Sequence, residues 1–247
     1  MAATDFLRAR PVNIEDFPLR LHFQPIVGLA DGRVFAYEAL LRLQQETGSL
    51  LSPADFLGNF ADRGLMPDVT RWVIRQAVGA LQSHADAIIF VNLDEESFAD
   101  ETILAFAAGR LAQAGVARIR LGFEVNELTA IRNTAAASDW LLEAKRLGFL
   151  SSLDDFGSGL FTTEHLVSLP IDVIKLDRTL VERLFRGEST SLLKALKSIA
   201  AWHRKALVAE GIADAELAEF ALRSGIPFGQ GYYLGRPVPE IPAGDQA

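Results

Sequence analysis

Short apolar runs rich in β-branched and aromatic residues alternate along the chain with amphipathic stretches of helical spacing. Eight runs that predict strands cover residues 20–28, 33–42, 87–94, 118–127, 148–157, 171–177, 205–212 and 227–235. Six stretches that predict helices cover residues 53–63, 68–82, 97–113, 134–147, 189–203 and 214–224. Strands that alternate with helices indicate βαβ units and a parallel sheet. Eight of them within about 220 residues predict an α/β fold, a closed (β/α)8 barrel, rather than an open sheet.

The link between the first two predicted strands is unusual because it contains only four residues, Leu29 to Gly32. Its Asp31-Gly32 pair is typical of a β-hairpin turn. We therefore expect the first strand to run antiparallel to the second. We expect one domain over residues 19–240, with residues 1–18 as an N-terminal extension and residues 241–247 as a tail.

Composition and charge exclude several kinds of site and of binding partner. The 247 residues carry a formal net charge of −8 and include no cysteine. Without cysteine, disulfides, thiolate zinc sites and cysteine nucleophiles are excluded, and the acidic balance argues against a nucleic-acid polymer or an anionic membrane as partner. No run approaches the roughly 18 consecutive apolar residues of a membrane span, and the N-terminus lacks the apolar core of a secretory signal. We therefore expect a soluble, cytoplasmic protein with no membrane segment.

Polar residues close the predicted strands, and in a parallel barrel the carboxyl ends of the strands meet on one face. These residues are Glu38, Asn92, Glu124, Asp154, Asp155, Lys175, Asp177, Glu210 and Gln230. Carboxylates gathered on one face would repel one another unless cations balance them. Oxygen ligands without cysteine or clustered histidine favour Mg²⁺ or Mn²⁺ over Zn²⁺.

The adjacent Asp154 and Asp155 are the most specific local element. Two carboxylates at one strand end can bridge and flank two metal ions about 3.5–4 Å apart, an arrangement suited to phosphoester hydrolysis. Lys175 would then orient or help to deprotonate the attacking water, and Arg42 would hold a phosphate oxygen.

Each of these residues also has a simpler interpretation. The aspartate pair could cap a helix or form a turn, and Lys175 could merely pair with Asp177 or another acid. Arg42 could pair with a surface carboxylate. The Gln230-Gly231-Tyr232 segment could be only a tight turn with a packed ring. Trp72, Trp140 and Trp202 lie on helical patterns and are predicted to be packing residues.

Sequence blocks spread over nearly the whole chain resemble one known family. They are Phe23-Gln24-Pro25-Ile26-Val27, Tyr37-Glu38-Ala39-Leu40-Leu41-Arg42, Gly64-Leu65-Met66 with Arg71-Trp72-Val73-Ile74, Val91-Asn92-Leu93, Phe123-Glu124-Val125-Asn126-Glu127, Leu153-Asp154-Asp155-Phe156-Gly157-Ser158-Gly159, Leu169-Pro170, Lys175-Leu176-Asp177, Ala209-Glu210-Gly211 and Gln230-Gly231-Tyr232. In this order they resemble the EAL domain, the bacterial phosphodiesterase of cyclic di-GMP; a three-letter match alone would be weak. The resemblance implies a modified TIM barrel with an antiparallel first strand. It also implies hydrolysis of one phosphodiester bond in cyclic di-GMP to give linear pGpG.

The resemblance implies roles for individual residues. One metal ion would be held by Glu38, Asn92, Glu124 and Asp154, and a second by Asp154, Asp155 and Glu210. The implied catalytic group is Lys175, Asp177, Glu210 and Glu38. The implied substrate contacts are Gln24, Leu41, Arg42, Asp155 and Gln230, and Glu127 would anchor the loop that follows Asp155.

Some positions depart from the family pattern. Ala213 stands where the family usually has a second glutamate, three residues after the Glu210 position. Leu160 replaces an aromatic residue in the loop that runs from Phe156 to Thr163. Asn126 replaces a threonine, and Asp94 replaces a serine after Asn92. The metal-ligand residues themselves are all present.

The leading hypothesis is a metal-dependent cyclic di-GMP phosphodiesterase that uses two Mg²⁺ or Mn²⁺ ions and is inhibited by Ca²⁺. The alternative is a catalytically weak or inactive EAL domain that acts as a cyclic di-GMP receptor, for which Ala213 and the altered loop argue. A protein-interaction module without nucleotide is a third hypothesis, and the intact ligand set argues against it. Amphipathic helices beside the predicted active-site loop favour a homodimer.

Overall fold

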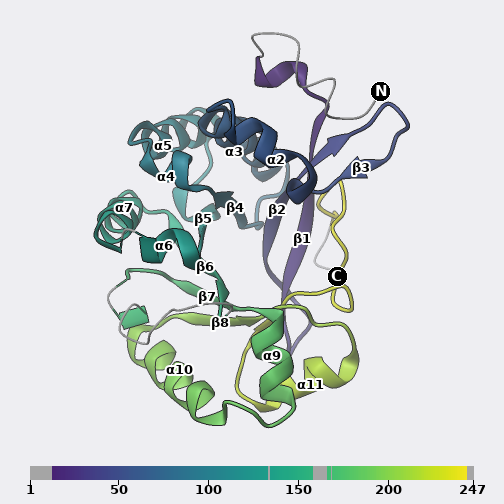
Figure 1. The fold of residues 1–247 in the computed structure, drawn as a ribbon, viewed down its shortest axis with the longest axis vertical. Helices are drawn as coiled ribbons and strands as arrows, with labels where there is room; N and C mark the ends of the chain where they lie inside the picture. Colours follow the sequence, from purple (N-terminus) through teal and green to yellow (C-terminus); the bar gives the residue numbers. More distant parts are fainter. Residues whose placement is uncertain (1–12, 133, 158–165, 168, 244–247) are drawn as a thin grey trace.

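Nine strands form one sheet in the computed structural model, which describes residues 13–132, 134–157, 166–167 and 169–243. They are β1 (Leu19–Gly28), β2 (Val34–Gln44), β3 (Leu50–Leu51), β4 (Ile89–Leu93), β5 (Leu121–Asn126), β6 (Leu150–Phe156), β7 (Val173–Leu176), β8 (Ala206–Ala209) and β9 (Phe228–Gly229). The order is β1-β9-β8-β7-β6-β5-β4-β2-β3, and a β1–β2 pairing closes the ring. Eight of these strands therefore make the closed barrel that the sequence predicts, and β3 extends the long β1–β2 ribbon (Figure 1).

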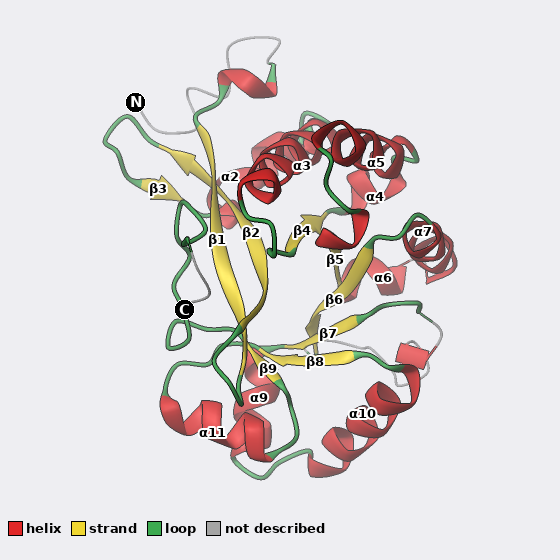
Figure 2. Cartoon of the chain, turned by 180° about the vertical axis from the view of Figure 1, so that it is seen from behind, coloured by secondary structure: helices red, strands yellow, loops and turns green. Residues whose placement is uncertain are grey.

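Helices surround the barrel on its outside (Figure 2). They are the 3-10 turns η1 (Ile14–Asp16) and η2 (Arg118–Arg120) and the α-helices α2 (Pro53–Ala61), α3 (Met66–Ser83), α4 (Glu95–Ala99), α5 (Thr102–Ala114), α6 (Glu127–Arg132), α7 (Thr134–Arg146), α9 (Arg178–Phe185), α10 (Thr190–His203) and α11 (Ala215–Arg223). Their buried faces pack against the outward side chains of the strands in one large apolar core. This is the layered arrangement of a (β/α)8 barrel.

The first strand runs against its neighbours, as the short Asp31-Gly32 link predicts. β1 pairs antiparallel with β2, with Gln24 opposite Glu38, and antiparallel with β9. All other neighbours in the ring, from β2 through β4 to β9, are parallel. Because β1 is reversed, its N-terminal half lies at the same rim as the carboxyl ends of the parallel strands.

The elements differ from the sequence prediction at a few points. The stretch predicted as one helix over 97–113 is divided into α4 and α5, because Asp94 caps a separate short helix by accepting hydrogen bonds from the Glu96 and Ser97 amides. The run 118–127 begins with the turn η2 before β5 starts. Two helices that follow strands directly, α6 and α9, were not predicted.

The barrel interior has two layers, because residues two apart on a strand point to the same side. The lower layer is apolar and consists of Ile26, Ala36, Phe90, Val173 and Val208. Two positions further along five of the strands, the side chains become polar: Glu38 follows Ala36, Asn92 follows Phe90, Lys175 follows Val173, Glu210 follows Val208 and Gln230 follows Phe228. The apolar layer is tightly filled. A Cβ on Gly122 would lie 2.3 Å from Phe90 Cε1, so only glycine fits beside that ring.

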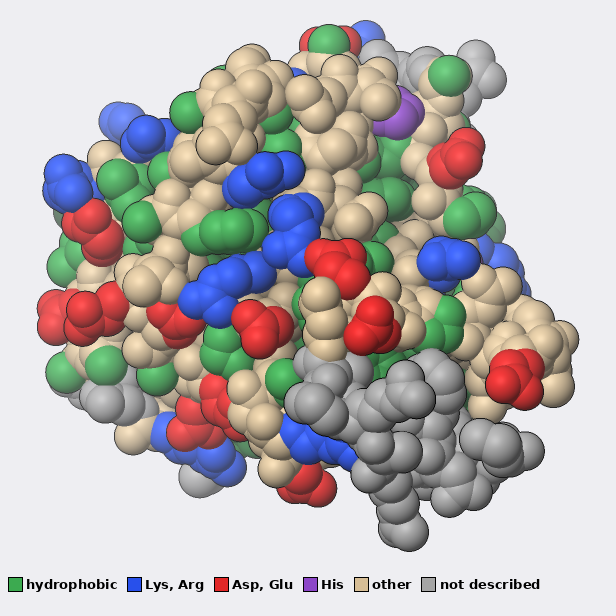
Figure 3. Space-filling model, turned by 90° about the horizontal axis from the view of Figure 1, so that it is seen from above, with side chains coloured by type: hydrophobic (Ala, Val, Ile, Leu, Met, Phe, Trp, Pro, Cys, Tyr) green, Lys and Arg blue, Asp and Glu red, His purple; other side chains and the backbone are tan. Residues whose placement is uncertain are grey.

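The outer surface mixes both signs of charge. On the face shown in Figure 3, basic and acidic side chains lie beside one another. The surface ion pairs include Arg71 with Asp100 and Arg75 with Glu15. Within the described residues, none of the helices combines the length and the hydropathy that a membrane span requires.

Candidate active site

The polar upper layer of the barrel is centred on Lys175, whose side chain is fully buried. Its ammonium nitrogen Nζ lies close to four carboxylates from four other strands or strand ends. The distances are 3.0 Å to Glu38 Oε2, 3.1 Å to Glu124 Oε2, 2.9 Å to Asp154 Oδ1 and 2.9 Å to Glu210 Oε1. Burial alone would lower the pKa of Lys175, but these carboxylates, Asp154 foremost, raise it well above its ordinary value. Lys175 is therefore a fixed cation in this arrangement.

Glu38 is held by neutral amides as well as by Lys175. Asn92 Nδ2 donates to Glu38 Oε1 at 2.9 Å, and Gln230 Nε2 donates to Glu38 Oε2 at 2.7 Å. Gln24 lies beside this pair, with its Oε1 3.4 Å from Gln230 Nε2. Burial opposes ionisation, but the Lys175 charge and these hydrogen bonds together lower the pKa of Glu38 below its usual value. Glu38 is thus an ionised carboxylate inside the barrel.

Glu124 has a different environment from Glu38. Its side chain is buried, and its Oε1 atom has no hydrogen-bond partner among the described residues. Burial raises the pKa of Glu124 well above its ordinary value, and only Lys175 opposes the effect among the principal causes. An unpartnered carboxylate oxygen in a dry interior is costly unless a donor or a cation meets it. Glu124 Oε1 therefore marks a position that fits a cation.

The aspartate pair owes its geometry to an irregularity in β6. Leu153 pairs with Ile174 and Phe156 with Leu176, so β6 contains one residue more than β7 between these pairs. Asp155 adopts a left-handed backbone conformation with φ of 57°, which is uncommon outside glycine and asparagine or aspartate. Neighbouring residues on a regular strand point to opposite faces. The bulge instead lets both carboxylates serve one site.

Three carboxylates of this region suit a metal ion. Ligand oxygens of Asp154, Asp155 and Glu210 all lie within 4.8 Å of one another. Burial, followed by the charge of Asp154, raises the pKa of Asp155 to about 6, and burial raises that of Glu210 to about 8. Asn126 donates to Asp155 Oδ2 at 2.7 Å and so fixes its orientation. Several acids share one ammonium here, and the hard oxygen donors fit Mg²⁺ or Mn²⁺.

Other predicted site residues lie around this group. Asp177 lines the cavity above it and caps α9 by accepting from the Thr179 amide at 2.8 Å. Glu127 is fully buried, and its Oε2 accepts a 2.8 Å hydrogen bond from the Gly157 amide, directly after the aspartate pair. The altered loop positions 158–163 lie outside the described residues.

Two predicted substrate contacts lie apart from the carboxylates. Leu41 is an odd number of residues from Glu38 on β2, is buried, and lines a separate apolar cavity against α2 and α3. Its assignment as a substrate contact is not supported by this position, since the alternation of β2 turns it away from the barrel interior. Arg42 lies nearer the rim, and its guanidinium donates to the Leu41 carbonyl at 2.8 Å.

The cavity over the carboxylates has a volume of about 440 Å³. Besides predicted residues such as Gln24, Glu38 and Glu210, its walls include Arg178, Ile212 and Tyr232, which the sequence interpretation did not assign to the site. The sequence pointed to these three residues only through their position, because each lies one or two residues after a polar residue that ends a strand. One interpretation of the sequence makes Tyr232 a packed ring, but this residue is 61% exposed.

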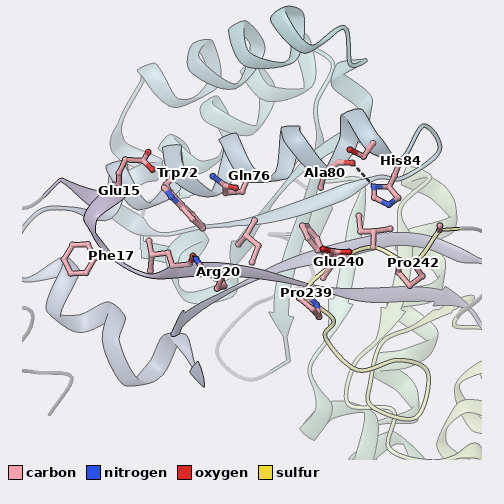
Figure 4. A pocket seen from close by; sticks show the side chains of 16 residues that line it. Glu15, Phe17, Arg20, Trp72, Gln76, Ala80, His84, Pro239, Glu240 and Pro242 are labelled. Carbon is pink, nitrogen blue, oxygen red and sulfur yellow. Dashed lines mark hydrogen bonds between the residues drawn. The ribbon is translucent and has the colours of Figure 1, made fainter. Parts of the chain in front are cut away.

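A larger hollow of about 990 Å³ lies elsewhere, on the outside of the barrel (Figure 4). Its walls come from β1, from α3 and from the segment 239–243. Its polar groups are engaged locally: Glu15 pairs with Arg75, and the His84 ring nitrogen Nδ1 lies 2.9 Å from the Ala80 carbonyl oxygen. The described lining contains no group of converging carboxylates, so the smaller cavity is the candidate active site.

Comparisons with known proteins agree with this choice. A cyclic di-GMP phosphodiesterase, PdeB of Shewanella oneidensis, is 32% identical over 232 residues, which cover 92% of this chain and 27% of that protein. The cyclic di-GMP phosphodiesterase PdeR of Escherichia coli K12 is 30% identical over 92% of this chain and 35% of its own length. This chain thus spans between about a quarter and about a third of the length of these curated relatives.

Solved structures give the same result. The PaMucR phosphodiesterase in complex with c-di-GMP has a TM-score of 0.82 and 31% identity, and the match covers 90% of this chain and 92% of that one. The FimX EAL domain from Pseudomonas aeruginosa, bound to c-di-GMP, has a TM-score of 0.82 and 28% identity, with coverage of 90% and 91%. The EAL domain family model matches residues 8–237. With its reversed first strand and its acidic barrel floor, this chain belongs to the EAL domain family.

Proposed function

We propose that this chain hydrolyses one phosphodiester bond of cyclic di-GMP to linear pGpG and requires two Mg²⁺ or Mn²⁺ ions. The observation that carries the proposal is the convergence of Glu38, Glu124, Asp154 and Glu210 on one buried floor around Lys175. The curated relatives named as cyclic di-GMP phosphodiesterases support the choice of substrate.

The residues of the site have two kinds of role: some would bind the metal ions, and others would orient those ligands or the substrate. One ion would be held by Glu38, Asn92, Glu124 and Asp154, and the other by Asp154, Asp155 and Glu210. When bound, such a pair of ions polarises the phosphate and supplies a strong oxygen nucleophile near neutral pH.

The supporting residues fix the ligands and the substrate. Asn92 and Gln230 orient Glu38 through their amide hydrogens, and this leaves the Asn92 Oδ1 atom as an acceptor. Lys175 holds the carboxylates together, and its raised pKa favours the role of a cation that orients groups over that of a proton acceptor. Asp177 borders the reacting position, and Arg42 at the rim would meet a phosphate oxygen.

A second candidate function is a cyclic di-GMP receptor without turnover. Ala213 lines the cavity where the family pattern usually supplies a further glutamate, so the site has one carboxylate fewer. A protein-interaction module that binds no nucleotide is disfavoured by the complete ligand set. The proposal also includes residues 19–240 as the domain, a cytoplasmic location and a possible homodimer.

One assay separates these functions. The protein is incubated with cyclic di-GMP and Mg²⁺ or Mn²⁺ at pH 8, and products are resolved by anion-exchange chromatography. We expect pGpG with either metal, none with EDTA, and none from Glu38→Gln, whereas Glu46→Gln on the exposed β2–β3 turn should retain wild-type turnover. Binding without product would establish the receptor function, and absence of both binding and product would refute cyclic di-GMP as the ligand.

A further inference from the structure

Ser152 is a buried polar residue to which the proposed function gives no role. It lies on β6 two residues before Asp154, so its side chain faces the barrel interior on the same side as that carboxylate. The residue is fully buried, and its Oγ atom has no hydrogen-bond partner within the described part of the chain. A buried hydroxyl without a partner costs free energy. Stability of the fold therefore does not explain a serine at this position.

The preceding residue on β6, Ser151, has a different environment. It is also buried, but it points to the other face of the strand, where its Oγ lies 3.3 Å from both the Pro170 carbonyl oxygen and Asp172 Oδ2. Its backbone amide also donates to Asp172 Oδ2 at 3.0 Å. Ser151 thus ties β6 to the residues that precede β7, which is an ordinary structural role for a buried serine.

The strand register places Ser152 at the boundary between the two interior layers of the barrel. Its Cα partner on β7 is Val173, which belongs to the apolar layer, and its Cα partner on β5 is Glu124, which belongs to the polar layer. Neighbouring strands lie about 4.8 Å apart. The Ser152 hydroxyl and the Glu124 carboxylate, both directed into the interior, are therefore next to each other in the ladder.

The barrel interior contains more unpaired acceptors than donors. Among the described residues there, the buried atoms without a hydrogen bond are the acceptors Glu124 Oε1, Asp154 Oδ1 and Gln230 Oε1 and one hydroxyl that can donate, that of Ser152. Asp154 Oδ1 already lies 2.9 Å from the Lys175 ammonium. Gln230 follows β9, which does not neighbour β6. Glu124 Oε1 is therefore the acceptor that the Ser152 hydroxyl can serve.

We propose that Ser152 is a positioning residue for Glu124: its hydroxyl donates to Glu124 Oε1, either after rotation about χ1 or through one buried water. A carboxylate oxygen has two lone pairs, so Oε1 can accept this hydrogen bond and still bind a cation. Since the Lys175 ammonium lies 3.1 Å from Oε2, both oxygens of Glu124 are then held in place. The proposal rests on the proposed function for the identity of the metal ion.

The test measures Mn²⁺ binding to the full chain by calorimetry at pH 8, independently of turnover. Loss of a hydrogen bond that orients a metal ligand typically weakens metal binding 10- to 100-fold. Ser152→Ala should therefore weaken binding of the ion that Glu124 holds about 10- to 100-fold. Binding of the other ion, assigned to Asp154, Asp155 and Glu210, should weaken less than about threefold. Ser152→Thr keeps the hydroxyl and should stay within about threefold of the wild type.

Ser151→Ala is the matched control, because it removes the same hydroxyl from the neighbouring position. It should lower the Tm in EDTA, since a buried hydrogen bond is lost, and leave the affinity for both Mn²⁺ ions unchanged. A merely structural role for Ser152 would give this same pattern in Ser152→Ala. Weaker binding of one ion, with rescue by Ser152→Thr, is the pattern that the positioning role requires.

The outcomes separate this proposal from the proposed function. If Ser152→Ala binds both ions as tightly as Ser151→Ala does, or if Ser152→Thr loses as much affinity as Ser152→Ala, the positioning role is overturned, while the phosphodiesterase proposal stands or falls on pGpG formation. Selective loss of one ion in a protein that forms no pGpG would support the positioning role and reject hydrolysis. A wild-type protein that binds no Mn²⁺ would overturn both.

Discussion

Removal of the central cation should destabilise the fold unless a metal ion replaces it. Lys175→Met preserves most of the side-chain volume and deletes the ammonium group that lies 2.9–3.1 Å from four carboxylate oxygens. Loss of one partner of a buried ion pair typically costs about 3–5 kcal/mol, because the remaining charges lose their compensation. For a chain of this size, that cost corresponds to a fall in Tm of about 6–20 °C.

The assay is thermal unfolding at pH 8 with EDTA and with Mn²⁺. Mn²⁺ should raise the Tm of Lys175→Met more than that of the wild type, because the ion supplies the missing positive charge. At pH 5 the deficit should shrink, since more of the carboxylates are protonated there. Lys194→Met on the exposed side of α10 is the control. A Lys175→Met protein whose Tm in EDTA equals that of the control would refute the idea that Lys175 holds the floor together.

Three further predictions concern pH, packing and calcium. Mn²⁺ affinity should rise about tenfold per pH unit between pH 6 and 8. The reason is that the pKa of Glu210 is raised to about 8, so a proton must leave this carboxyl before the ion binds. Calorimetry in several buffers measures the affinity at each pH, and an affinity that does not change with pH would contradict the prediction. Gly122→Ala should lower the free energy of unfolding by about 1–3 kcal/mol, because the added methyl group clashes with the Phe90 ring. Gly109→Ala is the control: no heavy atom lies within 4 Å of an added Cβ there, so the change should be neutral or stabilising. Urea unfolding measures both variants. Ca²⁺ should inhibit pGpG formation with Mn²⁺, because it prefers more ligands at longer distances; full turnover with Ca²⁺ alone would show that the site is less selective.

The sign of the pH effect on folding follows from the same group. Burial raises the pKa of Glu210 to about 8 in the folded protein, so the proton is retained up to about that pH, while an unfolded chain releases it near the ordinary glutamate pKa of 4.5. Between these values the folded state binds more protons, so a rise in pH through this window lowers the contribution of Glu210 to stability. A bound metal ion should remove that slope, because it replaces the proton.

The polar residues at the strand ends could be predicted from the sequence, because the pattern that marks them lies within each strand. Five of the barrel strands carry an apolar residue and, two positions later, a polar one, and strand polarity alone places the polar residues on one face. The short Asp31-Gly32 link likewise specified the antiparallel first strand. Trp72 and Trp140 are buried as predicted from their helical spacing.

Features that depend on tertiary structure could not be predicted. Trp202 has the same kind of helical spacing but is 85% exposed, because it lies at the end of α10 beyond the surface that α10 buries. The bulge at Asp154 and Asp155 depends on the register with β7, which a sequence does not display. Leu41 resembles a family contact by position, yet the alternation of β2 turns it toward the helices.

The reversed first strand determines where the chain enters the barrel. In a fully parallel barrel, β1 would begin at the end opposite the carboxylates, about 30 Å away for ten residues. Here it begins above them and descends to Gln24, which contacts Gln230. Residues 13–18 therefore join the barrel at the rim that carries the carboxylates, and we expect a displacement of that segment along the strand axis to move Gln24 and its contact with Gln230.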